Sequence, residues 1–313
     1  MKRPEQTEGG REVTIRARLE FWGVWICVKV LGALPRGVAR AVGRGIGAVA
    51  FFAFSRLLKV GRTNLQMALP KLSSDERERI LRGEYRSLGY QLAEFCQMPS
   101  YSAETASRLI RYEGLSRYIQ ARARGKGVLV LTGHLGAWEL SSFYHSLRGY
   151  PMGMVIRRLD NPLIDEMVNR VRCLHGNRVL HKDDFARGLI GEMRAGGTVG
   201  ILMDTNMTPP QGVFVPFFGV MACTASGLAR VARKTGAAVL PGFLLWEEEE
   251  KRYVLHFGEE LEIVSTEDQD DDARLNTARF TAILEDYVRR YPDQWLWMHR
   301  RWKTRPPGES GIY

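Results

Sequence analysis

Short apolar runs without polar alternation recur through the second half of the chain and constrain its fold more than any other feature. They cover residues 127–132, 150–156, 198–203 and 237–241. A strand that is covered on both faces has this composition, because neither of its faces meets water. Helix-like stretches separate the runs, at 135–148, 161–174, 183–195 and 224–235. This alternation predicts an α/β fold with a mainly parallel sheet flanked by helices.

The regions on either side of this alternation have their own patterns. Residues 19–112 are predicted to be mostly helical, with an amphipathic helix that begins at Ser74 and ends before Pro99. Near the other end, 242–246 and 252–257 predict an antiparallel hairpin with an acidic tip. A last amphipathic helix is expected at 273–291, followed by an aromatic and basic tail at 295–303. No internal repeat or long linker is evident, so we expect one domain with a helical N-terminal extension.

The composition narrows the class of protein. The 313 residues carry a formal net charge of +10 and are 45% apolar, which indicates a foldable protein whose surface favours anionic partners. The four cysteines lie far apart, so neither a disulfide framework nor a zinc site is indicated, and a reducing compartment is the simpler expectation. Zinc-finger spacing, RNP-like aromatic motifs and a convincing helix-turn-helix pattern are missing, so nucleic acid is not an expected partner.

Two apolar stretches near the N-terminus suit a membrane surface. Residues 19–34 contain tryptophans but also Glu20 and Lys29, and 46–54 is flanked on both sides by arginines. Aromatic rings and cations of this kind favour the boundary between headgroups and hydrocarbon, where anionic lipid is also attractive. Two alternatives remain open, namely a pair of core helices in a soluble protein and a single spanning anchor.

His134 and Glu139 are the candidate catalytic residues. His134 follows the run 127–132, and open α/β sheets bind ligands beyond the carboxyl ends of their strands. In one continuous helix, residues five apart point about 140° away from each other, so these side chains would not meet. We therefore expect His134 in the turn and Glu139 in the first helical turn, with its carboxylate folded back onto the imidazole.

A carboxylate bound to one ring nitrogen fixes the tautomer and leaves the other nitrogen free to accept a proton from a substrate hydroxyl. Such a pair makes an alcohol nucleophilic without a nucleophilic serine or cysteine. The alternative interpretation is a structural His134 in a corner between strand and helix, with Glu139 favoured there by the helix N-terminus.

Further blocks extend the pattern along the chain. In order they cover residues 133–139, 155–165, 204–206, 212–219, 224–237 and 297–306. Together they resemble the lipid A biosynthesis acyltransferases, the lauroyl and myristoyl transferases of the glycerolipid acyltransferase superfamily, with glutamate in place of aspartate in the His-x4-Asp block. The resemblance implies transfer of an acyl chain from a thioester, normally on acyl carrier protein, to a hydroxyl of a lipid A precursor or related glycolipid. It also implies His134 as general base and Glu139 as its orienting partner, with no cofactor besides the acyl thioester.

The transfer reaction that the resemblance implies calls for a cation. A tetrahedral intermediate carries negative charge on the former carbonyl oxygen, and arginine stays charged and offers several donors. Arg157, Arg170 and Arg172 are the candidates for this oxyanion or for substrate phosphate and carboxylate groups, and Asn161 is a further candidate for substrate binding. A solvated helix face is an equally open interpretation for any single arginine.

Asp204 follows the run 198–203, which brings a carboxylate to the same edge of the sheet as His134. It is expected to bind a sugar hydroxyl or to hold an arginine. Relatives often have a histidine or an acidic residue just after this aspartate, whereas Thr205 and Asn206 stand here. Residues 212–219 are expected to form an apolar loop, either near the acyl chain or in the core. No metal site is expected, because the other histidines lie singly, at His145, His175, His181, His256 and His299.

These inferences combine into one set of expectations. The chain is divided into a polar tail at 1–18, a membrane-associating helical segment at 19–62 and an acyltransferase domain at 63–313. The expected location is the cytoplasmic face of the bacterial inner membrane, with acyl carrier protein or acyl-CoA, a glycolipid acceptor and anionic lipid as partners. The alternatives are an acyl-CoA-dependent acyltransferase of a phosphoinositide mannoside or an amino-acid lipid, and a non-catalytic basic membrane-binding protein.

Overall fold

The computed structural model describes residues 14–181 and 185–313. Its centre is a seven-stranded sheet in the order β1-β9-β8-β2-β5-β3-β4, and neighbouring strands are parallel except for the antiparallel pair β8 and β9. The bounds of the strands are β1 Ile110–Glu113, β2 Val128–Thr132, β3 Gly153–Ile156, β4 Arg178–His181, β5 Thr198–Leu202, β8 Ala238–Glu247 and β9 Arg252–Phe257. The predicted α/β class and mainly parallel sheet are therefore confirmed.

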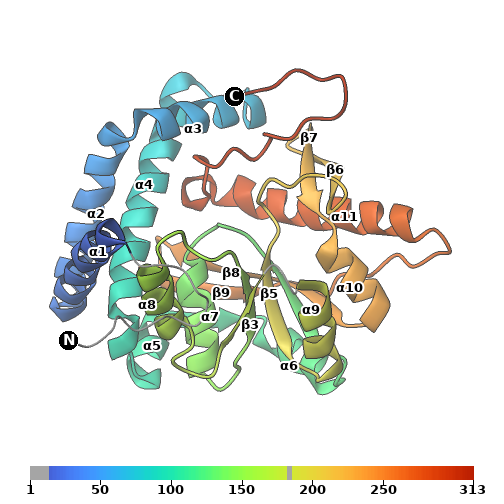
Figure 1. Cartoon of the computed structure of the whole chain (residues 1–313), viewed down its shortest axis with the longest axis horizontal. Helices are drawn as coiled ribbons and strands as arrows, with labels where there is room; N and C mark the ends of the chain where they lie inside the picture. The colour runs from blue at the N-terminus through green and yellow to red at the C-terminus, as the bar shows by residue number, and fades with distance from the viewer. Residues whose placement is uncertain (1–13, 182–184) are drawn as a thin grey trace.

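The central strand β2 shows why its sequence is apolar throughout. Val128 and Val130 face one core cluster, which includes Tyr118 of α6 and Phe143 of α7. Leu129 and Leu131 face the opposite cluster, with residues of α9, α10 and α11. The helices around the sheet are α5 Ala103–Leu109, α6 Leu115–Ala123, α7 Trp138–Leu147, α8 Pro162–Arg172, α9 Phe185–Arg194, α10 Gly227–Thr235 and α11 Gln269–Arg290. Both sides of the sheet are thus covered by helices (Figure 1).

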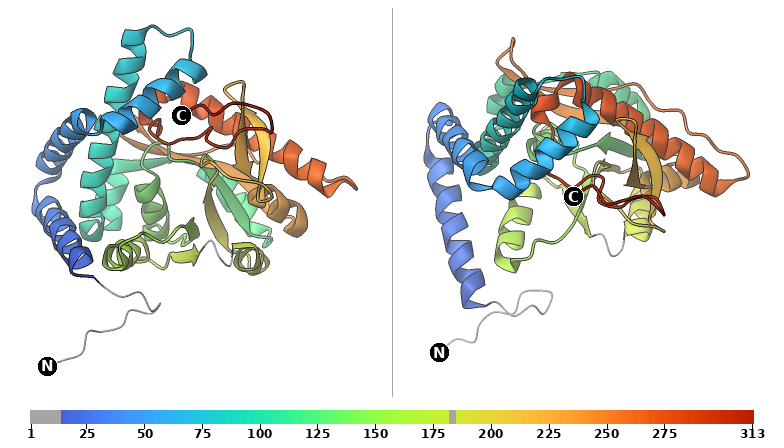
Figure 2. Two further views of the ribbon diagram at one scale, coloured as in Figure 1. Left: turned by 45° about the horizontal axis from the view of Figure 1, so that its top comes forward. Right: turned by 90° about the horizontal axis from the view of Figure 1, so that it is seen from above.

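The first four helices wrap around one end of the sheet (Figure 2). They are α1 Ile15–Ala33, α2 Arg36–Ala53, α3 Ser55–Ala68 and α4 Ser74–Gln97. Helix α4 begins with a capping box, in which the Ser73 hydroxyl accepts from the Glu76 amide and the Glu76 carboxylate accepts from the Ser73 amide. Helices α2 and α4 touch backbone to backbone, since a Cβ on Gly43 would lie 2.2 Å from the carbonyl oxygen of Gly89.

In the described residues, none of the helices has by itself the length and apolar composition needed to cross a bilayer. By length and composition alone, α2 and α3 together meet that test, but they form an angle of 86° at Phe54.

One predicted segment differs from expectation, and the position of another becomes clear only in the structure. Residues 212–219 do not form a loop, because β6 Gly212–Phe217 pairs with β7 Val220–Ala225 as an antiparallel hairpin. Phe217 in this hairpin is fully buried and stacks on Trp302. No position in the fold was predicted for the aromatic and basic tail, and the structure places it in the core, where Trp295, Trp297, Arg301 and Trp302 are all buried. The three tryptophan rings fill the space between the hairpin, α3, α4 and α11.

We call residues 294–302 the C-terminal segment. It begins at the last residue of the short helix η3 Pro292–Gln294, and it packs directly against the turn after β2. Leu135 forms an isolated bridge with Trp295, the Leu296 amide donates to the carbonyl of His134, and the Gly136 amide donates to the carbonyl of Gln294. The chain after β2 is therefore held by a segment that is distant in sequence.

Candidate active site

His134 lies in the turn between β2 and α7, at the carboxyl end of the central strand, as predicted. Other parts of the chain approach the backbone of this turn closely at Gly133 and at Gly136. A Cβ on Gly133 would lie 3.1 Å from the Asp204 carboxyl group, and one on Gly136, which has φ +64°, would lie 2.0 Å from the carbonyl oxygen of Leu244. Glycine at these positions lets the backbone pass close to β8 and to Asp204. The imidazole is consequently placed at the edge where β2 and β5 both end.

Asp204 supplies the carboxylate that holds His134. Its Oδ1 atom lies 2.9 Å from His134 Nδ1, and its Oδ2 atom accepts from the His134 amide at 2.6 Å and from Trp295 Nε1 at 2.9 Å. Asp204 is buried, whereas a quarter of the His134 side chain is exposed. The carboxylate thus requires a proton on Nδ1 of the neutral ring, which leaves Nε2 as the basic nitrogen.

His134 and Asp204 each stabilise the charged form of the other. Burial acts to lower the pKa of His134, but the charge and hydrogen bond of Asp204, with a contribution from Glu139, raise it above its ordinary value. Burial likewise acts to raise the pKa of Asp204, and His134 and Trp295 more than offset this and hold it below its ordinary value. Asp204 is therefore a carboxylate over the whole neutral pH range.

Glu139 lies in the first turn of α7 as predicted, but its carboxylate contacts another partner than the one expected. Its Oε2 atom accepts from Arg172 Nε at 2.8 Å and its Oε1 atom accepts from Arg172 Nη2 at 2.5 Å. The prediction that the Glu139 carboxylate accepts a hydrogen bond from the imidazole is therefore wrong. Nδ1 of the imidazole is bound to Asp204, and the Glu139 carboxylate is bound to the Arg172 guanidinium. Glu139 acts on His134 through its charge.

Arg172 is fixed on several sides. Besides Glu139, its Nη1 atom donates to Asn169 Oδ1 at 3.1 Å, and its carbonyl accepts from Asn177. Burial acts to lower the pKa of Arg172, and the hydrogen bond and charge of Glu139 raise it above the ordinary value. A planar guanidinium held by a bidentate carboxylate keeps a fixed orientation, so its position in the site is well defined.

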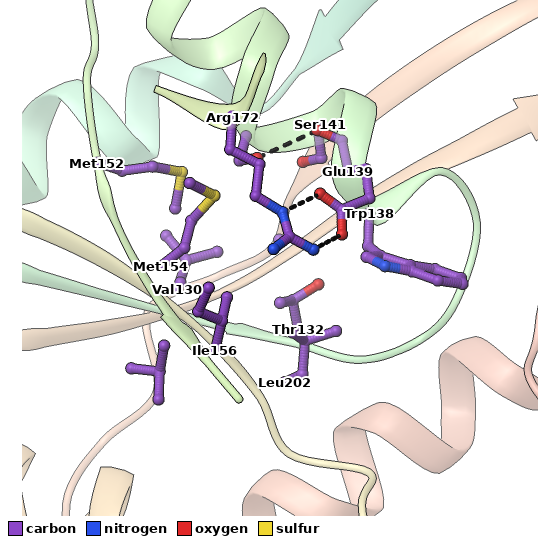
Figure 3. A pocket seen from close by; sticks show the side chains of 14 residues that line it. Val130, Thr132, Trp138, Glu139, Ser141, Met152, Met154, Ile156, Arg172 and Leu202 are labelled. Carbon is purple, nitrogen blue, oxygen red and sulfur yellow. Dashed lines mark hydrogen bonds and ion pairs between the residues drawn. The ribbon is translucent and has the colours of Figure 1, made fainter. Parts of the chain in front are cut away.

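A cavity of about 60 Å³ lies beside this ion pair (Figure 3). Glu139 and Arg172 line one side together with Trp138, whose ring stands edge to face with the His134 imidazole. The rest of the wall is mostly apolar and comes from the central strands, at Val130, Met152, Met154, Ile156, Gly200 and Leu202. The cavity therefore leads from the polar site into the apolar side of the sheet.

The remaining candidates lie outside this cluster. Arg157 is 82% exposed on its side chain and pairs with Asp160, and Arg170 is 76% exposed and pairs with Glu166. Asn161 caps α8 and donates to the carbonyl of Ala17 in α1 at 2.8 Å. Of the predicted set, the structure thus brings Glu139, Arg172 and Asp204 around His134. Arg157, Arg170 and Asn161 interact with neighbouring polar groups elsewhere.

The C-terminal segment contributes residues that the sequence alone did not single out. Trp295 donates to Asp204, and Arg301, fully buried, donates to the carbonyl oxygens of Thr205 and Cys223 at 3.3 and 3.0 Å. His299 accepts from the amide of Asn206 through Nε2 at 3.1 Å. The density of tryptophan in 295–302 was a usable signal, because a solvated tail rarely contains three such rings.

Within the described parts of the chain, no group of three or more His, Cys, Asp or Glu side chains is arranged to hold a metal ion. The cluster at His134 instead combines a base with its carboxylate, a fixed cation and an adjoining apolar cavity. Such a site can activate a hydroxyl and stabilise a developing oxyanion.

The sequence is similar to those of known proteins along nearly its whole length. Residues 8–304 match the model of the family described as bacterial lipid A biosynthesis acyltransferase. The chain is 30% identical over 297 residues to the lipid A biosynthesis palmitoleoyltransferase of Escherichia coli (strain K12), over 94% of this chain and 95% of the relative. It is 28% identical over 299 residues to the lauroyltransferase of the same strain, with 94% and 95% covered, and 24% identical over 297 residues to its myristoyltransferase, with 94% and 90% covered.

Proposed function

Since the chain belongs to the bacterial lipid A biosynthesis acyltransferase family and is an acyltransferase, we propose that it moves a fatty acyl group from acyl carrier protein to a hydroxyl of a lipid A precursor, with His134 as general base. The observation that supports this proposal most is the His134–Asp204 pair, whose imidazole contacts the ring of Trp138 in the wall of an apolar cavity. The pair can activate an alcohol, and the cavity accepts hydrocarbon.

The reaction follows from the tautomer of His134. Nε2 takes the proton of the acceptor hydroxyl as its oxygen attacks the carbonyl carbon of the acyl thioester, and Asp204 stabilises the imidazolium that forms. The tetrahedral intermediate then breaks its carbon–sulfur bond, and the thiolate takes the proton from Nε2. An ester and a free thiol result, and His134 returns to its neutral state.

We propose that Arg172 stabilises the oxyanion of the tetrahedral intermediate. It is the one predicted arginine whose side chain lines the cavity beside His134, and Glu139 fixes its orientation through two hydrogen bonds. A positive guanidinium that is already oriented stabilises charge as it develops on the carbonyl oxygen, without reorganisation during the reaction. In this assignment Glu139 is a positioning residue for Arg172, and Asp204 is the residue that orients the base.

The apolar cavity is assigned to the acyl chain. Its volume of about 60 Å³ is small, so a long chain enters only when lining side chains move. Met152 and Met154 are suited to this, because methionine has three flexible bonds and fills irregular space. The chain length that is accepted therefore depends on how far these two side chains can rearrange.

The donor, the acceptor and the membrane share a negative charge in this proposal. Acyl carrier proteins, phosphorylated sugars and inner-leaflet lipids are anionic, and the chain has a net charge of +10. The cytoplasmic face of the inner membrane provides all three partners. No bound cofactor enters the reaction, because the energy comes from the thioester itself.

The test is product analysis with purified protein. Wild-type protein and His134→Ala are incubated with glycolipid acceptors and matched acyl chains on acyl carrier protein or on CoA, and product masses are measured. We expect an added acyl group with wild type, preferentially from acyl carrier protein, and no product with His134→Ala. His175→Ala is the matched control, because this histidine packs on Phe143 outside the cavity. Normal transfer by His134→Ala would exclude the assigned base.

A further inference from the structure

A second pocket lies on the outer side of α4, away from the cavity beside His134. It is open, has a volume of about 570 Å³, and is formed between α4 and η3. Gly83 allows the two elements to meet, because a Cβ at this position would lie 2.5 Å from the Cβ of Asp293. Its lining residues are Arg79, Ile80, Arg82, Gly83, Arg86, Pro292 and Asp293. It therefore shares no lining residue with the candidate active site.

The pocket has more positive than negative charge. Arg79, Arg82 and Arg86 follow each other at intervals of three and four, which places them along one face of α4. Asp293 faces only Arg86, at 3.4 Å between Oδ2 and Nη2. In the described part of the chain, Arg79 and Arg82 have no carboxylate within ion-pair distance.

The acidic residues nearest along the helix are engaged elsewhere. Glu76 completes the capping box with Ser73, and Glu78 accepts from Arg62. Hydrogen bonds with Ser73 lower the pKa of Glu76, and the charge of Arg79 adds to this effect. The hydrogen bond with Arg62 lowers the pKa of Glu78, and the charge of Arg82 adds to it. Both carboxylates thus already have partners. The two unpaired guanidiniums thus remain available to an external anion.

An exposed apolar surface adjoins this pocket. The Arg82 guanidinium lies 4.8 Å from the centre of the Phe51 ring, which lies 5.3 Å from the ring of Phe52. Phe52 is 73% exposed, and it stands where α2 meets α3 at an angle of 86°. We call the exposed side chains at this corner the α2–α3 ridge, which consists of Val49, Phe52, Phe54 and Leu57. Figure 1 shows this corner next to the part of α4 that faces the end of α11.

We propose that the pocket on α4 binds the phosphate of an anionic phospholipid, while the α2–α3 ridge enters the hydrocarbon beside it. Cations that lie next to exposed aromatic and aliphatic side chains match a molecule in which phosphate and hydrocarbon are joined. An acidic protein surface would match the arginines but would leave Phe52 and Phe54 in contact with its polar groups. The occupant assigned here is therefore a lipid headgroup, in a site separate from the one that carries out acyl transfer.

Vesicle binding tests this site without any catalytic step, so its outcome does not depend on the proposed function. Full-length protein is mixed with phosphatidylcholine vesicles that contain or lack phosphatidylglycerol, and the bound fraction is measured by cosedimentation. We expect Arg79→Gln combined with Arg82→Gln to weaken binding to the phosphatidylglycerol vesicles about 30-fold, from about 1 kcal/mol for each cation at an anionic surface.

The control has the same change of net charge at distant positions. Arg124→Gln combined with Arg274→Gln removes two arginines that pair with Glu260 and Asp271 on the surface. An equal loss of binding in both double variants would overturn the site, since only overall charge would then matter. Phe52→Ser combined with Phe54→Ser is expected to weaken binding to both kinds of vesicle, and unchanged binding by this variant would overturn the role of the ridge.

Two further measurements separate the lipid from other occupants. Inorganic phosphate alone is titrated by calorimetry, and the proposal expects binding far weaker than to vesicles. Tight phosphate binding that Arg79→Gln and Arg82→Gln abolish, with vesicle binding unchanged, would identify a site for a free anion and overturn the proposal. Acyl transfer between acyl carrier protein and detergent-dispersed acceptor should be the same in the arginine variant and wild type. Its loss there would place the arginines in the substrate site instead.

Discussion

One carboxylate, that of Asp204, receives three N–H donors that fix the geometry of His134. The donors are the imidazole Nδ1 of His134 at 2.9 Å, the amide of His134 at 2.6 Å and the indole Nε1 of Trp295 at 2.9 Å. The ring and the backbone of the same histidine are thus bound by the two oxygens of one residue. A change at Asp204 alters both the orientation of the imidazole and the turn that carries it.

Asp204→Asn is expected to lower kcat by about 10²–10⁴ while the protein stays folded. Asparagine has one acceptor oxygen for three donors, and it lacks the charge that stabilises the imidazolium. Steady-state kinetics with a saturating acyl donor measure the effect. Asp286→Asn is the control, since this residue is an exposed partner of Arg290 on α11. Full activity of Asp204→Asn would show that another group orients the base.

The pH dependence of kcat/KM reports the protonation of His134. A general base works in its neutral form, so the rate should fall as the pH drops through the pKa of His134. Because Asp204 and Glu139 raise this pKa, the inflection is expected above the ordinary value of about 6.5. In Asp204→Asn the residual activity should show the inflection at lower pH, because the main counter-charge is gone. An inflection that stays in place would mean that a different group titrates.

Arg172→Lys should lower kcat by about 10²–10³ with a smaller effect on KM. Lysine keeps the charge but cannot make the bidentate contact with Glu139, so the cation loses its fixed direction. Glu139→Gln is expected to reproduce part of this loss. Arg170→Lys provides the comparison, because it changes an exposed arginine on the same helix. Equal kinetics for both arginine variants would remove Arg172 from the reaction.

Gly200→Ala should shift the preference of the enzyme toward shorter acyl chains. The added methyl group would lie 2.8 Å from the terminal carbon of Met152, which can move but then takes space from the cavity. The loss of room for one methylene corresponds to about 0.8 kcal/mol, or about fourfold in relative kcat/KM between neighbouring chain lengths. Competition between acyl donors of different length measures the shift. Gly191→Ala, which has open space around it, should leave the preference unchanged.

Strands β2, β3, β5 and β8 could be predicted from apolar runs. Residues 127–132, for example, are apolar without interruption since β2 lies between two core clusters. The short edge strands β1 and β4 have no such run and were not predicted. Asp204 could also be placed at the edge near His134, because β5 is the neighbour of β2 and both end there.

The sequence did not allow us to predict which carboxylate binds His134. Glu139 is five residues away and Asp204 is 70 residues away, so the local pattern favoured Glu139. The choice is made by Arg172, which comes from α8 and takes up the Glu139 carboxylate. The packing partners of the tryptophans in 295–302 were equally hidden, because they come from α3, α4, α11 and the β6–β7 hairpin, which are distant in sequence. Contacts between distant segments decided both points.

Glu84→Gln is expected to stabilise the protein relative to wild type as the pH rises. Glu84 is buried beneath the C-terminal segment, and burial raises its pKa to about 8 from an ordinary value of 4.5. Between these values the unfolded chain releases a proton that the folded chain retains, so wild type loses stability on the order of 3–5 kcal/mol from pH 4.5 to 8. Glutamine does not titrate, so the variant lacks this loss.

Thermal unfolding of wild type and Glu84→Gln across this pH range measures the difference, which should grow with pH and level off above about 8. Glu104→Gln, at an exposed position on α5, is the control and should follow wild type. A constant difference between Glu84→Gln and wild type would show that Glu84 ionises normally.

The burial of Trp295 against Asp204 also sets an order of events during synthesis. Asp204 follows His134 by 70 residues, and Trp295 follows Asp204 by a further 91. At about 5–20 residues per second, the ribosome needs on the order of ten seconds or more to make the last of these partners after His134 has been added. During this time the nascent chain carries His134 without the indole that completes its surroundings. Asp204 can receive all three of its N–H donors only when translation has passed Trp295.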